Sequence, residues 1–223
     1  MSGISPIDLL DEAVRPALAA LGDRWGGRSA EQLLMGTAAV ESGLVKLRQY
    51  GFEPGSKVGA IGFWQGEPFT FHDILKRLNR EQTAELHQAV VFLATVQEPD
   101  PDEMAWNLRF AAAMARMKYR DAKPALPEPW DIAGFEEYHK RFYNSALGAT
   151  RPGEFTRAWN NLIAPSAARM RPRLKPGLPA RSSSSSPDSC SSSAAPEPRF
   201  GWSITAASRT PETPPSTRTA GPP

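Results

Sequence analysis

Apolar residues over 5–170 recur at helical spacing, which predicts a mainly α-helical fold. In the first predicted helix, Ser5 stands at the N-cap and Pro6 at the first helical position, and Gly22 ends the helix. Its apolar positions, three and four residues apart, are Ile7, Leu10, Val14, Leu18 and Leu21. Strand signal is confined to residues 57–63, so we expect only a minimal β segment.

Start and stop signals predict further helices along the same region. Ser29 and Gln32 have the spacing of a capping box for a helix that Gly43 would end. Thr70 and Asp73 indicate another helix start, with Asp73 in a capping role. Other helices are expected over 81–97, from Asp100 through an alanine-rich stretch to Tyr119, from Asp131, and from Pro152. The small side chains of the alanine-rich helix allow close packing, so we expect it to be central.

The composition changes near Met170 and divides the chain into a domain, 1–170, and a tail, 171–223. The tail is rich in Ser and Pro and has too little apolar surface to offset the entropy of ordering, so we expect it to be disordered. The tail carries seven basic and three acidic residues, which gives it a net charge of +4, whereas the net charge of the whole chain is +2. The domain is therefore near neutral at −2, which argues against a nucleic-acid partner.

Cysteine and histidine usage excludes several kinds of site. Cys190 is the only cysteine, which leaves no internal disulfide and no cysteine-based zinc site. The three histidines are dispersed along predicted helices, where ordinary surface or core-edge roles are expected: His72, His87 and His139. We therefore expect no metal and no other cofactor.

Uncharged runs such as 32–40 are far shorter than the roughly 18 apolar residues that a membrane span needs, so no span is predicted. Near the N-terminus, Asp8, Asp11 and Glu12 interrupt what would be the apolar stretch of a signal peptide. The sequence thus predicts neither a membrane span nor an export signal.

Glu41 is a candidate for acid–base chemistry. It lies near the end of the second predicted helix, on the face shared by Leu34 and Ala38. Burial on that face and the negative end of the helix dipole both disfavour the charged carboxylate, which suits a general acid. The alternative is that Glu41 turns into solvent at a frayed helix end.

Three short motifs occur in order along the chain. They are Glu41-Ser42-Gly43, then Gly62-Phe63-Trp64-Gln65 followed by Pro68 and Thr70, and finally Tyr143-Asn144 after the alanine-rich helix. Together they resemble the soluble lytic transglycosylases and the wider goose-type lysozyme-like superfamily, over residues 29–155. The general pattern also looks like small phage-encoded members of that superfamily. Departures from the usual motifs are Phe63-Trp64, Phe142 and Ser145.

The resemblance implies a lysozyme-like helical domain that cleaves the MurNAc–GlcNAc bond of peptidoglycan, with Glu41 as acid and then base. It implies that Ser42 orients the substrate and that Gly62 lets the backbone pass close to the saccharide. Gln65 would hydrogen-bond in a cleft, opposite Tyr143. The Tyr143 hydroxyl would lie on Glu41, and Asn144 would hold that wall.

Two neighbouring residues keep two interpretations each. Trp64 would either stack on a sugar ring or pack in the core. Glu67 would either activate water as a second carboxylate, which a hydrolase favours, or be a plain exposed residue. Without convincing evidence for a second carboxylate, we expect a transglycosylase whose products carry anhydro-muramyl ends.

The expected partners are the peptidoglycan glycan strand and, for a phage protein, other virion proteins. Such a protein would be made in the host cytoplasm and be virion-associated or released to the wall, in entry or lysis. The alternative from another class is a non-catalytic virion structural or DNA-ejection protein that keeps a lysozyme-like fold. A helical adaptor, with Glu41 only capping a turn, is a third interpretation.

Overall fold

The computed structural model describes residues 3–49, 51, 54, 58–144 and 151–170, and these are mainly helical, as the apolar spacing predicts. The tail over 171–223 and Ser145 lie outside the described residues. The helices in chain order are α1 (Pro6–Leu9), α2 (Arg15–Leu21), α3 (Arg28–Ser42), α4 (Pro68–Leu78), α5 (Ala84–Phe92), α6 (Leu108–Lys118), α7 (Ile132–Phe142), α8 (Glu154–Ala158) and α9 (Ala167–Met170).

The first two helices follow the predicted boundaries. A π-helical turn, Leu10–Val14, joins α1 to α2, so helical backbone continues from Pro6 to the residue before Gly22. Gly22 has φ 91°, a left-handed value that favours glycine and ends the helix. Ser5 stands at the N-cap position but makes no side-chain capping bond.

The predicted capping box of α3 is wrong. The helix begins at Arg28, after Gly27, and no side chain caps it. Gln32 is instead buried, and its Oε1 accepts a 2.7 Å hydrogen bond from the backbone N–H of Trp130. The Gln32 side chain, which local spacing predicts to cap the helix, thus bonds a residue 98 positions away in the sequence. At the other end, Gly43 terminates α3 as predicted, with φ 62°.

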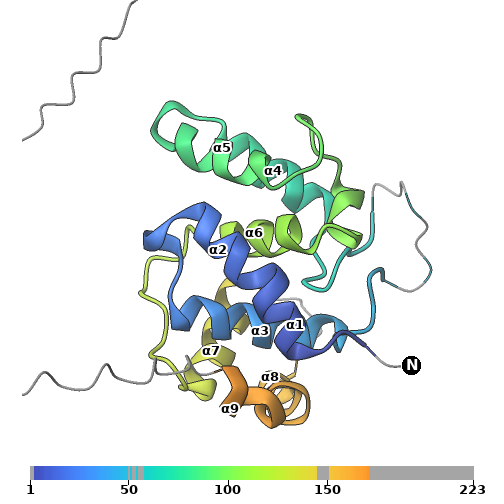
Figure 1. The fold of residues 1–223 in the computed structure, drawn as a ribbon, viewed down its shortest axis with the longest axis vertical. Coiled ribbons are helices and arrows are strands. Elements are labelled where there is room, and N and C mark those ends of the chain that lie inside the picture. Colours follow the sequence, from blue (N-terminus) through green and yellow to red (C-terminus); the bar gives the residue numbers. More distant parts are fainter. Residues whose placement is uncertain (1–2, 50, 52–53, 55–57, 145–150, 171–223) are drawn as a thin grey trace, which may run out of the picture. The chain divides into compact units, whose positions relative to one another are not determined.

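The alanine-rich helix is central but starts later than predicted. Asp100 caps only a short 3₁₀ helix, Pro101–Ala105. Buried Glu103 accepts hydrogen bonds from Thr95 N (2.7 Å) and Asn107 Nδ2 (2.8 Å), and Asn107 then caps α6 by accepting from the Phe110 N–H. The α6 helix contacts α2, α3, α4 and α5, and Figure 1 shows it between α4–α5 and α2–α3.

Two other helices differ from prediction in their bounds or caps. The α4 helix begins at Pro68, and Asp73 pairs with Arg77 one turn later (2.9 Å) instead of capping. The α5 helix covers only Ala84–Phe92 of the predicted 81–97, preceded by a 3₁₀ turn, Glu81–Thr83. Asp131 caps α7 as predicted, accepting from the Gly134 N–H (2.9 Å).

In place of a strand, the segment after α3 forms a tight turn. Ile61 makes isolated bridges with Arg48 and with Gly66, and no longer strand is found in the described part of the chain. Ile61 and Gly66 exchange both backbone hydrogen bonds at 2.9 Å, which closes a four-residue turn over 62–65. This turn is the Gly-Phe-Trp-Gln motif itself.

Close packing of α3 against α8 sets the position of the lower helices in Figure 1. A Cβ atom on Gly36 would lie 2.1 Å from Cζ of Phe155, which is fully buried. Glycine in mid-helix therefore lets the Phe155 ring touch the α3 backbone. The α7 helix also contacts both α3 and α8.

Candidate active site

Glu41 occupies the last turn of α3, where local hydrogen bonds fix the helix end. The Ser42 hydroxyl donates to the Ala38 carbonyl (2.8 Å) and accepts from the Leu44 N–H (3.2 Å). Ser42 is buried, with 4% of its surface exposed. Its hydroxyl thus closes the helix end, a role different from the substrate contact that the resemblance implies.

The Glu41 carboxyl faces the protein interior, with 20% of its side chain exposed. Its Oε1 lies 3.2 Å from Nε2 of His139, a residue of α7 that is fully buried. The oxygen lies off the direction of a ring N–H, so within the described residues Nε2 is a buried nitrogen without a linear hydrogen bond. Glu41 Oε1 and His139 Nε2 are therefore within ion-pair distance but do not form an aligned hydrogen bond.

The other nitrogen of His139 belongs to a buried hydrogen-bond chain. Nδ1 lies 2.9 Å from the Tyr119 hydroxyl, which lies 2.8 Å from Oγ1 of Thr37. The Thr37 hydroxyl in turn donates to the Leu33 carbonyl at 2.8 Å. Burial raises the pKa of Tyr119 far above its ordinary value, so its hydroxyl stays protonated.

Tyr143 lies beside this pair but does not bond Glu41. Its hydroxyl donates to the Trp64 carbonyl (2.6 Å), so the expected hydroxyl–carboxyl contact is wrong. The Trp64 carbonyl lies in the buried part of the 62–65 turn, and it takes the proton of the Tyr143 hydroxyl in place of the Glu41 carboxyl. Burial, and secondly the charge of Glu41, raise the pKa of Tyr143 well above its ordinary value.

Lys118 connects the candidate residues electrostatically. Its ammonium lies 3.7 Å from the centre of the Tyr143 ring, a cation–π contact. Burial lowers the pKa of Lys118, while the charges of Glu41 and Glu67 oppose that shift. Both carboxylates are therefore close enough to act on the same ammonium group.

The turn over 62–65 uses its motif residues to hold itself together. Gly62 has φ 76°, and a Cβ atom there would lie 2.4 Å from the Met104 carbonyl oxygen. The close approach of the Met104 carbonyl is therefore enough to require a glycine here, independently of the saccharide contact that the resemblance implies. Gln65 has a left-handed φ of 45°, and its Nε2 donates to the Gly62 carbonyl at 2.7 Å.

Trp64 is a core residue. Its ring is 2% exposed, and Nε1 donates to the Leu34 carbonyl at 2.9 Å. A buried indole has no open face for a sugar, so the stacking interpretation is wrong and the packing interpretation fits.

The two remaining candidates lie at helix ends. Glu67 is exposed just before α4. The Asn144 N–H donates to the His139 carbonyl at the end of α7 (3.2 Å).

The fold thus brings Glu41, Trp64, Glu67 and Tyr143 around Lys118, whereas Ser42 and Gly62 serve the backbone. Sequence reasoning missed His139 as the neighbour of Glu41. The signal was available, because His139 precedes Tyr143 by one helical turn and any helix that brings Tyr143 to Glu41 brings His139 too.

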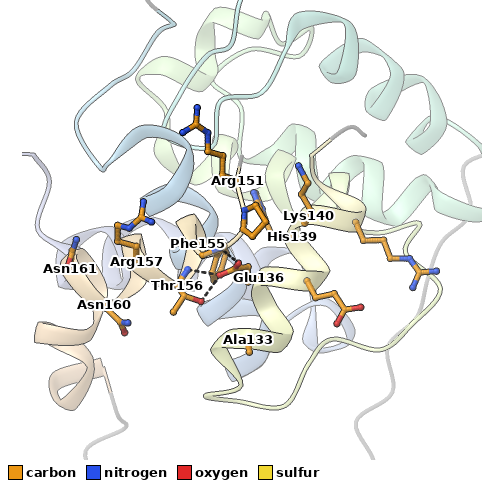
Figure 2. A pocket seen from close by; sticks show the side chains of 14 residues that line it. Ala133, Glu136, His139, Lys140, Arg151, Phe155, Thr156, Arg157, Asn160 and Asn161 are labelled. Carbon is orange, nitrogen blue, oxygen red and sulfur yellow. Dashed lines mark hydrogen bonds between the residues drawn. The ribbon is translucent and has the colours of Figure 1, made fainter. Parts of the chain in front are cut away.

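Behind His139 lies a cavity of about 800 Å³ between α7 and α8 (Figure 2). Glu136 lines the cavity and accepts hydrogen bonds from Gly153 N, from Thr156 N (3.0 Å) and from the Thr156 hydroxyl (2.6 Å). Burial alone would raise the pKa of Glu136, but these hydrogen bonds and His139 lower it. Basic side chains also line the cavity: Lys140, Arg141, Arg151 and Arg157.

Comparison of the chain with protein-family models, with curated proteins and with solved structures finds no match in any of the three. Across the described residues, no group of three or more His, Cys, Asp or Glu side chains is arranged to hold a metal ion. Nor does that part of the chain contain a helix with the length and apolar character to cross a bilayer.

Proposed function

We propose that this chain is a peptidoglycan lytic transglycosylase with a lysozyme-like helical domain, acting in phage entry or lysis. The observation that carries the proposal is the Glu41 carboxyl, which is mostly buried, flanked by charged groups, and not held by an aligned hydrogen bond within the described residues. Such a carboxyl is free to exchange its proton with a substrate. The ordered motifs at 41–43, 62–65 and 143–144 add the substrate class by resemblance.

In the proposed reaction, Glu41 protonates the glycosidic oxygen as the bond to C1 of the muramyl sugar breaks. The N-acetyl group of that sugar shields the developing cation. The primary hydroxyl on C6 then attacks C1, and its proton passes to Glu41 as the anhydro ring closes. Acid and base steps use the same carboxyl, so one carboxyl group suffices where most glycosidases use two.

The surroundings of Glu41 support this use. The Lys118 ammonium stabilises the carboxylate that is left after protonation of the leaving group, and Tyr143 holds both Lys118 and the 62–65 turn near it. Gln65 has a left-handed backbone, which non-glycine residues rarely adopt and which occurs often at functional sites. Hydrogen bonds within the turn and from Tyr143 hold it, and Tyr143 is the residue that links it to Glu41.

A lysozyme-type hydrolase is a second candidate, because Glu67 acts on the same ammonium as Glu41. A water between the two carboxylates would then attack C1 in place of the C6 hydroxyl. The two functions differ in product: the hydrolase leaves a free reducing end, and the transglycosylase leaves an anhydro-muramyl end.

The test is digestion of purified sacculi, with release measured over time and muropeptides identified by mass. We expect anhydro-muramyl ends from the wild type and a loss of about 10²–10⁴-fold in Glu41→Gln. Glu85→Gln, on the exposed side of α5, is the matched control and should keep wild-type release.

Full activity in Glu41→Gln would overturn the proposed site. Free reducing ends, lost in Glu67→Gln, would assign the hydrolase instead. No release by the wild-type chain would favour the non-catalytic virion protein.

A further inference from the structure

The hydrogen-bond chain behind His139 has only one consistent direction. A carbonyl has no proton to give, so the contact between Thr37 Oγ1 and the Leu33 carbonyl uses the single proton of the Thr37 hydroxyl. Thr37 must then accept from the Tyr119 hydroxyl, 2.8 Å away. That uses the single proton of Tyr119, so the Tyr119 oxygen must accept from His139 Nδ1 at 2.9 Å.

The direction of the chain fixes the tautomer of His139. With Nδ1 carrying a proton, a neutral ring leaves Nε2 bare. Nε2 is the buried nitrogen that lies 3.2 Å from Glu41 Oε1. A bare nitrogen beside an ionised carboxylate sets two lone pairs against each other with no donor between them, which burial makes costly.

We propose that Glu41 and His139 hold one exchangeable proton between Oε1 and Nε2, and that this pair, rather than a lone carboxyl, is the proton store of the site. The proton is carried by Glu41 beside a neutral ring, or by His139 beside a carboxylate. For the proton to be shared, Oε1 must come into line with Nε2, from which it lies 3.2 Å away.

Charged and neutral groups face the ring from each element packed against it. Glu41 faces it from α3, and Glu136, one turn earlier on α7, carries a charge that acts on it. Tyr143 is stacked on it (centroids 5.3 Å apart, 21° between planes) and stays neutral. From α6, the neutral Tyr119 bonds Nδ1, and Lys118 lies on the Tyr143 ring.

From α8, the apolar Phe155 ring packs against His139, with the ring centroids 5.4 Å apart. The basic side chains Lys140, Arg141, Arg151 and Arg157 line the cavity that His139 also lines. In Figure 2 the His139 ring lies between Phe155 and Lys140, with Arg151 beyond it. The two carboxylates are thus the anionic neighbours that the ring has on α3 and on its own helix.

For the reaction, this inference rests on the proposed function. The pair gives its proton to the glycosidic oxygen, which leaves Glu41 as a carboxylate beside a neutral His139. The C6 hydroxyl proton returns to the pair as the new C6–O–C1 bond forms, so no proton is taken from solvent. His139 is buried and touches no substrate, so it is a positioning residue.

The test is ¹⁵N NMR of the full chain labelled at histidine, which reports the protonation of each ring nitrogen. We expect Nδ1 of His139 to stay protonated over pH 5–9 in the wild type. In Glu41→Gln the exchangeable proton is gone, so the ring should be neutral with Nε2 bare, accepting from the amide. In Tyr119→Phe, Nδ1–H loses its acceptor, and the ring should change to the Nε2–H tautomer.

A wild-type ring with bare Nδ1 would overturn the inference, as would unchanged His139 signals in Glu41→Gln. His139→Asn identifies the signals among the three histidines. It should also lose at least about 10-fold in sacculus digestion and one limb of the pH–rate profile. Full activity of Glu41→Gln would defeat the proposed function alone, because the ring signals are read without substrate.

Discussion

Glu41 and Glu136 are two carboxylates that both interact with His139, and the fold treats them differently. Glu136 accepts three hydrogen bonds from Gly153 and Thr156, and its pKa is lowered. Within the described part of the chain, Glu41 has one ion-pair contact, with His139, and that contact is not aligned for a hydrogen bond. Of these two glutamate side chains, Glu136 is thus held by hydrogen bonds and Glu41 is not.

The difference separates a structural carboxylate from a reactive one. Donors around Glu136 stabilise its charged form and join α7 to α8, so its proton is not available near neutral pH. Among the described residues, the donor in contact with Glu41 is the ring nitrogen of His139, which can share its proton. Hydrogen-bond saturation, more than burial, therefore distinguishes the two.

The largest expected loss of stability comes from disturbing the contact between α3 and α8, the helix whose N-terminal residues donate the hydrogen bonds to Glu136. Gly36→Ala places a methyl group against the buried Phe155 ring. Overpacking costs about 1–3 kcal/mol, partly offset by about 1 kcal/mol from alanine's higher helix propensity. Because the methyl group would lie 2.1 Å from an atom of a fully buried ring, the overpacking cost falls at the upper end of that range, and we expect a net loss of about 2 kcal/mol in urea unfolding. Phe155→Leu makes room, so the double variant should cost less than the sum of the singles; additive costs would contradict the contact.

Glu136→Gln should come next, with a loss of about 1 kcal/mol at pH 7, since the charge-assisted hydrogen bonds of this partly buried carboxylate weaken. The folded pKa lies below the ordinary value of 4.5, so this stability is present above pH 4.5 and is lost as pH falls through the folded pKa. Urea unfolding from pH 3 to 7 should show the wild type and the variant converging in acid. Glu137→Gln, the exposed neighbour, is the control; an equal loss there would point to a general charge effect.

The smallest effect is expected for Glu41→Gln, where thermal stability should change by less than about 1 kcal/mol or rise slightly. A neutral amide removes the desolvation cost of a partly buried charge and can donate to Nε2 of His139. Thermal unfolding followed by circular dichroism measures it. A loss of about 3–5 kcal/mol, as when a buried ion pair is broken, would make Glu41 a structural residue like Glu136.

Helix ends that depend on neighbouring residues were predictable from the sequence. Asp131 caps α7, Gly43 ends α3, and Pro6 begins α1, because each acts through its own backbone angles or a hydrogen bond to a residue three positions away. The position of Glu41 in the last turn of α3 follows from the same local rules. The strand signal over 57–63 did not lead to a strand in the described residues, where Ile61 makes only isolated bridges.

Side chains with distant partners were not predictable in this way. Gln32 fails as a cap because the Trp130 N–H takes it, and the helix expected from Asp100 is interrupted because Glu103 bonds Thr95 and Asn107. Both polar groups are buried, and a buried polar group must be paired wherever a partner lies.

The sequence by itself therefore determined the helices, the central alanine-rich segment and the candidate carboxyl at Glu41. Only the tertiary structure decided what surrounds that carboxyl. His139, 98 positions away, meets it because α7 packs on α3, and Tyr119 meets His139 because α6 ends there. Spacing along a helix fixes which residues share a face, whereas the packing of several helices decides which faces meet.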